Sequence, residues 1–146
     1  MPSADGPPVR WDESGTPHST AFNDIYRSQS PAGGGLAQAR EVFLRGCGLL
    51  GSPPAWCRAP TWTILETGFG LGLNALAAWQ AWRDDPHRPE RLHLVSIESH
   101  PVRASDLLQS VAAWPALQPL AQQLAKAWWG MGSGLHRLSF EGGGSV

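Results

Sequence analysis

Three alternating glycines follow an acidic residue in the stretch ETGFGLGLN, residues 66–74. Gly68 can take backbone angles that are closed to residues with a Cβ, so the chain can turn sharply there. Gly70 lets the backbone come close to a ligand, and Gly72 lets a following helix pack tightly on the preceding strand. The first turn of that helix offers unpaired N–H groups and a partial positive charge. The stretch therefore predicts a site for a ligand with a carboxylate or a phosphate.

The spacing of the glycines distinguishes between two classes of ligand. The dinucleotide fingerprint is G-x-G-x-x-G, whereas this sequence has Leu73 where the fingerprint has its third glycine. Glu66 would repel a pyrophosphate, but it can accept a hydrogen bond from an ammonium group, directly or through water. A strand followed by E-x-G-x-G-x-G is the pattern that binds S-adenosyl-L-methionine, with Glu66 at the methionine ammonium and the amides of residues 68–72 at its carboxylate. A dinucleotide-dependent oxidoreductase is the less favoured alternative.

A second acid lies where a nucleoside cofactor needs one. Glu98 ends the apolar run RLHLVSIE, residues 91–98. In nucleotide-binding α/β folds an acid at the end of the second strand holds the ribose hydroxyls, about 20 residues after the glycines. Glu98 comes a little later than that, and the loop DDPHRPE accounts for the excess. We expect Glu98 to chelate the ribose diol.

These residues need a strand–helix–strand unit to bring them together. The β-branched stretch TWTILE, residues 61–66, predicts a buried strand, and residues 91–98 predict a second one. Residues 71–85 predict a helix, because their apolar positions recur at helical spacing. Its predicted inner side holds Leu73, Leu76, Ala77 and Ala81. This order predicts a right-handed βαβ crossover with parallel strands.

The flanking segments carry weaker patterns. Residues 1–20 predict a loose arm, and residues 30–35 predict a flexible joint. Residues 21–28 predict a short strand or a lid, with Asp24 and Tyr26 over the ligand. A helix is predicted over residues 36–50, with one face formed by Leu36, Ala39, Val42 and Phe43. Helices are also predicted over residues 99–114 and 115–129, and a short strand over residues 134–140.

The composition narrows the class of protein. A length of 146 residues suits one domain, and 42% apolar with 16% charged residues is typical of a globular chain. A net charge of -1 provides no basic field that would hold nucleic acid unaided. Cys47 and Cys57 stand outside any Cys/His cluster, and the five histidines show no metal spacing, so we expect no metal. No apolar run approaches the ~18 residues of a membrane helix. The start of the chain has no signal-peptide pattern, so we expect a soluble, cytoplasmic protein without a membrane partner.

Several motifs together resemble one known family. ILETGFGLGLNALAAWQAW, RLHLVSIESHPV, DLLQSVAAWPALQPLAQQL and GLHRLSFEGG occur in the order and spacing of that family. The upstream TPHSTAFNDIYRS and GLAQAREVFLRG match its start. The family is the methyltransferase domain of the bifunctional tRNA 5-methylaminomethyl-2-thiouridine biosynthesis protein. The resemblance covers nearly the whole chain, but only the N-terminal part of the family.

The resemblance implies a fold, an activity and a site. The fold class would be α/β, a Rossmann-like S-adenosylmethionine-dependent methyltransferase fold, truncated after the second parallel strand and a following helical region. The activity would be methylation of the amine of 5-aminomethyl-2-thiouridine at the wobble position of tRNA. In many members an FAD-dependent oxidoreductase domain follows. By the family motif, Asp24 and Tyr26 belong to the segment that closes over the cofactor. The implied cofactor contacts are Glu66, Thr67, Gly68, Phe69, Gly70, Gly72, Asn74 and Glu98.

The family continues beyond the point where this sequence ends. Its members carry a later segment with the acid that methyl transfer needs, so the resemblance implies a catalytic residue beyond residue 146. We interpret residues 1–60 as an N-terminal arm and lid segment with one helix. Residues 61–146 then form the N-terminal half of a Rossmann-like methyltransferase domain. A non-catalytic remnant or interaction module is the alternative.

Overall fold

A parallel pair of strands forms the centre of the fold. In the computed structural model, which describes residues 7–27 and 34–146, β4 (Thr61–Thr67) pairs in parallel with β5 (Arg91–Ile97). The connection between them contains α2 (Leu73–Asp84). The predicted strand–helix–strand unit is therefore confirmed, with ends that differ from the predicted ones by one or two residues. The prediction that residues 61–66 form a buried strand is wrong, because the residues of β4 alternate between exposed and half-buried.

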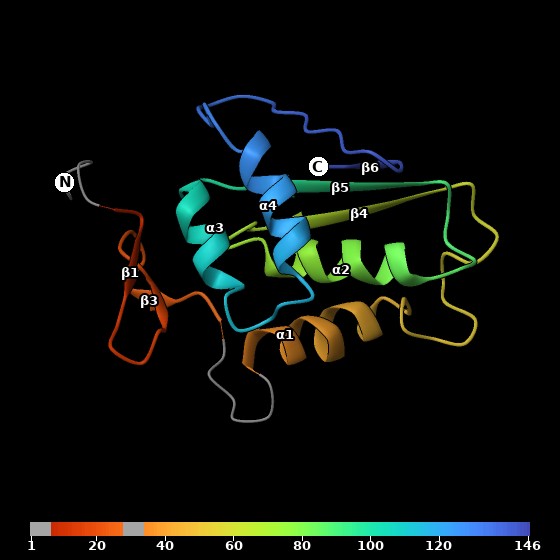
Figure 1. The fold of residues 1–146 in the computed structure, drawn as a ribbon, viewed down its shortest axis with the longest axis horizontal. Helices are drawn as coiled ribbons and strands as arrows, with labels where there is room; N and C mark the ends of the chain where they lie inside the picture. Colours follow the sequence, from red (N-terminus) through yellow and green to blue (C-terminus); the bar gives the residue numbers. More distant parts are fainter. Residues whose placement is uncertain (1–6, 28–33) are drawn as a thin grey trace.

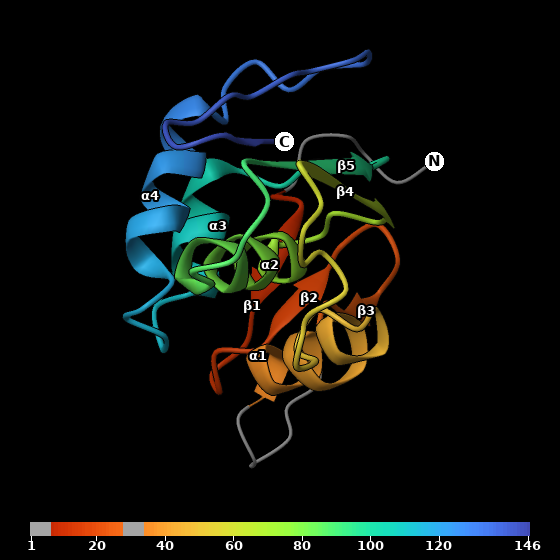
Figure 2. The same ribbon diagram turned by 90° about the vertical axis from the view of Figure 1, so that its right-hand side faces the viewer.

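The two faces of this sheet have different surroundings. Figures 1 and 2 both show α2 on one side of β4 and β5. The last residues of the chain lie at the edge of the sheet, where they pair with β5. Leu92 and Leu94 point to the helical side and are buried. Residues of the opposite face are exposed, with Leu65 at 67% and Ile97 at 64%. Among the residues that the structure describes, β4 has a strand on one side only, because the order of the sheet is β4-β5-β6, with β6 at Gly144–Ser145.

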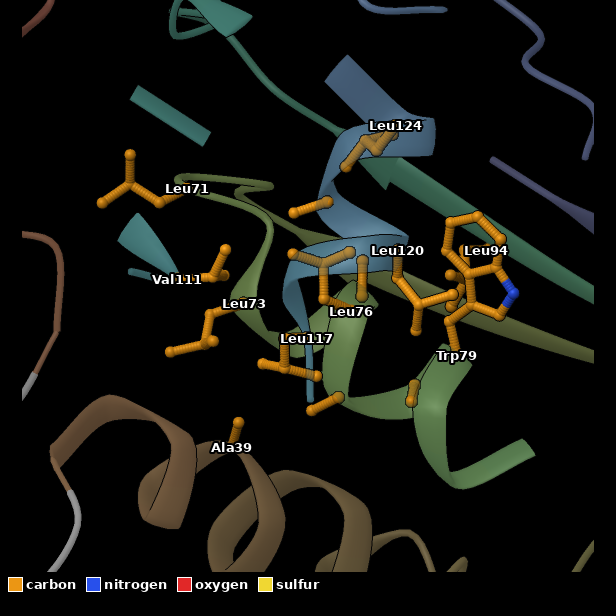
Figure 3. Packing of buried hydrophobic residues seen from close by; sticks show 14 of the residues in the cluster. Ala39, Leu71, Leu73, Leu76, Trp79, Leu94, Val111, Leu117, Leu120 and Leu124 are labelled. Atoms are coloured by element: carbon orange, nitrogen blue, oxygen red, sulfur yellow. The ribbon is translucent and has the colours of Figure 1, made fainter. Parts of the chain in front are cut away.

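Two further helices complete the helical layer. They are α3 (Ala104–Ser110) and α4 (Gln118–Ala127), both shorter than the segments predicted for them. Figure 3 shows Leu76 of α2 near Leu117 and Leu120 of the α4 region, in a cluster that also includes Leu94. Full burial of a leucine side chain stabilises the fold by about 1.5–3 kcal/mol. Small residues on α2 let the neighbouring elements approach it, namely Ala75, Ala77 and Ala78.

The N-terminal region forms a second, antiparallel sheet, so the prediction of a loose arm over residues 1–20 is wrong for residues 9–19. This sheet contains β1 (Val9–Trp11), β2 (Pro17–Ser19) and β3 (Asp24–Ile25). Asp12 closes the turn between β1 and β2 by accepting hydrogen bonds from the backbone N–H groups of Ser14 and Thr16. The predicted short strand within residues 21–28 is confirmed as β3.

The helix predicted over residues 36–50 has an unexpected winding. It begins as α1 (Gly34–Gln38) and continues as the π-helix η1 (Ala39–Leu44). Ala39 is buried as predicted, but Val42 and Phe43 are exposed, so the predicted apolar face is wrong there. A π-helix has an i→i+5 bonding pattern, which turns Leu44 inward five residues after Ala39. Of the predicted joint over residues 30–35, residues 30–33 lie outside the described residues, and Gly34 and Gly35 belong to α1.

The end of the chain also differs from the prediction. Residues 134–140 do not form a strand; the third strand is β6 (Gly144–Ser145), which pairs in parallel with β5. The glycine-rich EGGG turn folds the chain back, so that Leu138 and Val146 exchange backbone hydrogen bonds. The residues after the turn, rather than those before it, thereby reach β5.

Candidate functional site

The glycine-rich loop connects β4 to α2 in a left-handed backbone conformation. The φ angles are +81° at Gly68, +56° at Gly70 and +73° at Gly72. Residues with a Cβ rarely adopt such angles, which confirms that this turn requires glycine. At Gly72 there is also no room for a side chain, because an added Cβ would lie 2.8 Å from the ring of Phe69. The close approach at Gly72 is therefore to the loop's own aromatic ring rather than to the strand.

The N–H groups of the three glycines are all used within the chain. Gly68 N–H donates to the Ile97 carbonyl at 2.7 Å, and Gly72 N–H donates to the Phe69 carbonyl at 2.9 Å. Gly70 N–H donates to the Glu98 carboxylate at 2.8 Å. The expected contact of these amides with a ligand carboxylate is therefore not preformed.

The first turn of α2 provides other donors beside the loop. Leu76 N–H makes a helical bond to the Gly72 carbonyl at 2.9 Å. In an α-helix the N–H groups before that position have no intrahelical acceptor. The N–H groups of residues 73–75 are thus the donors best placed for an anionic group, and the positive end of the helix dipole lies at the same point. Asn74, a predicted contact, lies in this turn and is partly exposed.

Glu98 connects the end of β5 to the loop. One of its oxygens, Oε2, accepts from Gly70 N–H, and Oε1 accepts from His100 N–H at 2.8 Å. An ionised carboxylate has about four lone-pair positions. Two acceptor positions therefore remain on Glu98 for hydroxyl groups of a ligand.

Glu66 lies near the end of β4, next to β5. Thr67 follows it as the last residue of β4 and is exposed. Ser96 of β5 donates a hydrogen bond from its Oγ to the Glu66 carboxylate. Burial raises the pKa of Glu66 above its ordinary value; the hydrogen bond from Ser96 opposes that shift, and the negative charge of Glu98 adds to it. The site therefore contains two half-buried carboxylates, one bonded to a serine hydroxyl on the neighbouring strand and one bonded to backbone N–H groups.

Gly68 lines three hollows, two of which are large enough for a small molecule. One has a volume of about 480 Å³ and lies between the N-terminal sheet and Glu98. The other has a volume of about 410 Å³ and lies beside Glu66 and Asn74. Both volumes fall within the range of small-molecule sites, about 300–1,000 Å³. The loop thus separates a space next to one carboxylate from a space next to the other.

The predicted lid residues lie at this loop. Tyr26 packs over Gly70, since its ring carbon Cδ1 is 3.4 Å from the position of an added Cβ there. Burial raises the pKa of the Tyr26 hydroxyl, with smaller contributions from neighbouring carboxylates. Asp24 is exposed and lines the 480 Å³ hollow together with Tyr26. The N-terminal sheet therefore covers the loop from outside the βαβ unit.

One predicted contact residue has another role in packing. The Phe69 side chain is 5% exposed and stacks on Trp128, with ring centroids 4.7 Å apart. The ring therefore packs in the core, between Gly72 of the loop and Trp128. The structure brings together the backbone of residues 68–72 with the side chains of Glu66, Glu98 and Tyr26.

Sequence reasoning missed three residues at the site. Ser96 had a usable signal, because it is a polar residue in an apolar strand and pairs in register with Glu66. Phe22 and His100 form an edge-to-face pair at 5.0 Å along the outer hollow. Nothing local in the sequence predicts that contact, because it depends on how the N-terminal sheet docks.

Two classes of feature are absent from residues 7–27 and 34–146. No three His, Cys, Asp or Glu side chains in these ranges are grouped so that they could hold a metal ion. Nor does this part of the chain contain a helix of the length and apolar character needed to cross a membrane.

Comparison with known proteins agrees with the resemblance described above. The chain is 57% identical over 136 residues to the tRNA 5-methylaminomethyl-2-thiouridine biosynthesis bifunctional protein MnmC of Acidovorax sp. (strain JS42). It is 57% identical over 135 residues to the MnmC protein of Polaromonas sp. (strain JS666) and 54% identical over 136 residues to that of Paracidovorax citrulli. The chain is a homologue of part of MnmC. The match covers 93% of this chain but only 20% of the Acidovorax MnmC, so the chain spans about a fifth of the length of these relatives.

Two other comparisons concern the family and the fold. No protein-family model matches the chain. The crystal structure of MnmC2 from Aquifex aeolicus superposes with a TM-score of 0.52 at 24% identity. It covers 70% of this chain and 32% of the Aquifex chain, and at this identity the likeness supports the fold alone. Together with the parallel sheet, it confirms the predicted α/β, Rossmann-like fold.

Proposed function

We propose that this chain binds S-adenosyl-L-methionine at the loop of residues 66–74 and forms part of a tRNA methyltransferase. The reaction would be methylation of the amine of 5-aminomethyl-2-thiouridine at the wobble position, which yields 5-methylaminomethyl-2-thiouridine. The names of the relatives support this substrate, since they are bifunctional proteins of 5-methylaminomethyl-2-thiouridine biosynthesis.

One observation carries the proposal. Glu66 and Glu98 lie at the carboxyl ends of adjacent parallel strands, and a left-handed glycine loop lies between them with a hollow on each side. In open α/β sheets ligands bind at the carboxyl ends of the strands. A ligand with a cationic and anionic end and a ribose diol matches this arrangement better than a pyrophosphate does.

Each group of the cofactor has a counterpart in the chain. Glu66 would accept from the methionine ammonium, and the first turn of α2 would meet its carboxylate. Glu98 retains two acceptor positions, which match the two ribose hydroxyls. Tyr26 and Asp24 would close over the loop from the N-terminal sheet. When bound, the cofactor would supply a methyl group on a positively charged sulfur.

The substrate amine must lose its proton before it can attack the methyl group. We assign no residue of this chain to that step, and we expect the responsible carboxylate in a segment that the resemblance places beyond residue 146. Residues 1–60 would act as arm and lid, and residues 61–146 as half of the methyltransferase domain. The partners would be tRNA and an FAD-dependent oxidoreductase domain, and the protein would work in the cytoplasm. With a net charge of -1, contact with tRNA would depend on a local patch or a second module.

Calorimetric titration of the chain with S-adenosyl-L-methionine tests the proposal, with NAD as the competing ligand class. We expect saturable binding that Glu98→Gln weakens about tenfold or more, because hydrogen bonds to a charged group contribute about 1.5–3 kcal/mol each. Glu90→Gln is the matched control, since Glu90 is exposed and precedes the opposite end of the same strand. Binding of NAD alone, or no binding by a chain whose circular dichroism shows it folded, would contradict the proposed cofactor.

A further inference from the structure

Ser96 lies opposite Glu66 in the register of β4 and β5. We propose that Ser96 is a positioning residue, whose hydroxyl keeps the Glu66 carboxylate ionised and aimed at the cationic ammonium end of the cofactor. This inference rests on the proposed function, because it concerns the same binding site.

The geometry makes Ser96 the residue that orients Glu66. Both side chains lie on the helix-facing side of the sheet, at equivalent positions near the carboxyl ends of adjacent parallel strands. The Ser96 Oγ donates to Glu66 Oε1, which leaves Oε2 to accept from a ligand. Ile64 and Leu94 precede the pair by two residues on the same side, so the carboxylate stands at the border between the core and the loop.

The charges around Glu66 explain why such a donor is needed. Among the described residues that line the adjacent 410 Å³ hollow, Glu66 is the one charged side chain, and Cys47 is the other titratable one. Glu98, at the end of β5, adds a negative charge that favours protonation of Glu66. Among the described residues no cation lowers the pKa of Glu66, and the hydrogen bond from Ser96 is what lowers it.

A direct consequence for binding follows. An ionised Glu66 attracts an ammonium group, whereas a protonated Glu66 does not. Removal of the Ser96 hydroxyl would raise the pKa of Glu66 further, because the half-buried carboxylate would lose its donor. As the pH is lowered, the variant would then lose its affinity for S-adenosyl-L-methionine at a higher pH than the wild type does. A serine that only filled space would leave that pH dependence unchanged.

The test compares the pH dependence of binding among four proteins. Affinity for S-adenosyl-L-methionine is measured from about pH 5 to about pH 8 in the wild type, Ser96→Ala, Ser96→Thr and Ser145→Ala. Ser145→Ala is the matched control, since its hydroxyl also bridges two parallel strands, to His93 Nδ1 at 2.7 Å. We expect the midpoint of Ser96→Ala to lie about one pH unit higher, because a hydrogen bond to a carboxylate shifts its pKa by about that amount. Ser96→Thr keeps a hydroxyl and should retain the wild-type midpoint.

A second measurement addresses folding and the link to Glu66. The Glu66 carboxyl carbon is titrated by NMR without ligand in the wild type and in Ser96→Ala, and its midpoint should rise in the variant. If Ser96→Ala is too unstable, the Ser96→Cys variant, with its weak S–H donor, should show the same direction of change. If the wild type binds S-adenosyl-L-methionine and the midpoint is unchanged in these variants, the role of Ser96 is overturned and the proposed function is not. Absence of wild-type binding would overturn the proposed function and this inference with it.

Discussion

Gly72→Ala is a sharp test of how the loop is built. An added Cβ would lie 2.8 Å from both Cε1 and Cζ of Phe69. Carbon atoms pack best at about 3.5–4.0 Å. Phe69 is 5% exposed and stacked on Trp128, so its ring has little freedom to move away. The variant therefore combines an overpacked contact with a left-handed backbone angle of +73°.

Gly68→Ala is the matched control for this variant. Its φ of +81° is also left-handed, but an added Cβ would meet nothing within 4 Å. Left-handed geometry costs about 1–2 kcal/mol for a residue with a Cβ, and both variants should lose that amount. The entropy that alanine removes from the unfolded chain is the same in both and cancels in the comparison. Overpacking adds about 1–3 kcal/mol at Gly72 only.

Urea unfolding followed by circular dichroism measures the difference. With a slope near 2 kcal/mol per molar urea, Gly72→Ala should unfold at a midpoint about 0.5–1.5 M below that of Gly68→Ala. Trimming the ring by Phe69→Leu in the Gly72→Ala background should recover part of this difference, because the two sites share one contact. Equal midpoints for the two alanine variants would refute the packing argument and leave backbone geometry as the sole reason for the glycine.

Two further predictions concern stability elsewhere in the chain. Trp82→Phe should lower the free energy of unfolding by about 1–3 kcal/mol. The reason is that the buried Trp82 indole donates to the Pro89 carbonyl at 2.8 Å, and the carbonyl would lose this partner in the variant. Chemical denaturation measures the change, and a neutral effect would mean that water replaces the bond. Asp12→Asn should lower stability at neutral pH. Hydrogen bonds, the largest from Ser14, hold the pKa of Asp12 well below its ordinary value, so its contribution is present above the unfolded-state pKa of about 3.9 and is lost as the pH falls toward the folded-state pKa. The gap between variant and wild type in thermal unfolding should therefore narrow in acid, and a constant gap would contradict the assignment.

The central unit could be predicted because its signals are local. The β-branched strand, the glycine turn and the helical spacing of α2 each depend on residues close together in the sequence. The two acids follow from the same unit, because parallel strands bring their carboxyl ends to one edge of the sheet. For Glu66 the structure provides a hydrogen-bond donor and a pKa direction, and for Glu98 it provides two backbone donors, while their contact with a cofactor remains a prediction.

The parts that could not be predicted depend on contacts between distant segments. The N-terminal sheet docks through Trp11, whose indole donates to Asp106 at 3.2 Å, and through Arg27, which donates to the Ser110 carbonyl at 2.6 Å. These pairs are separated by more than eighty positions in the chain, and no local pattern indicates them. The π-helical winding of η1 and the burial of the Phe69 ring are likewise set by what packs against them. Composition and periodicity do not contain that information.

The open side of β4 has a consequence for how the chain behaves in concentrated solution. Backbone N–H and C=O groups along a free strand edge can pair with another chain. The strand TWTILET is seven residues long, lacks proline and has one charged residue, and Leu65 on its uncovered face is 67% exposed. Natural proteins protect such edges with lysines, prolines or bulges, and within the described residues β4 has none of the first two. Self-association through added strands is therefore expected when this chain is concentrated.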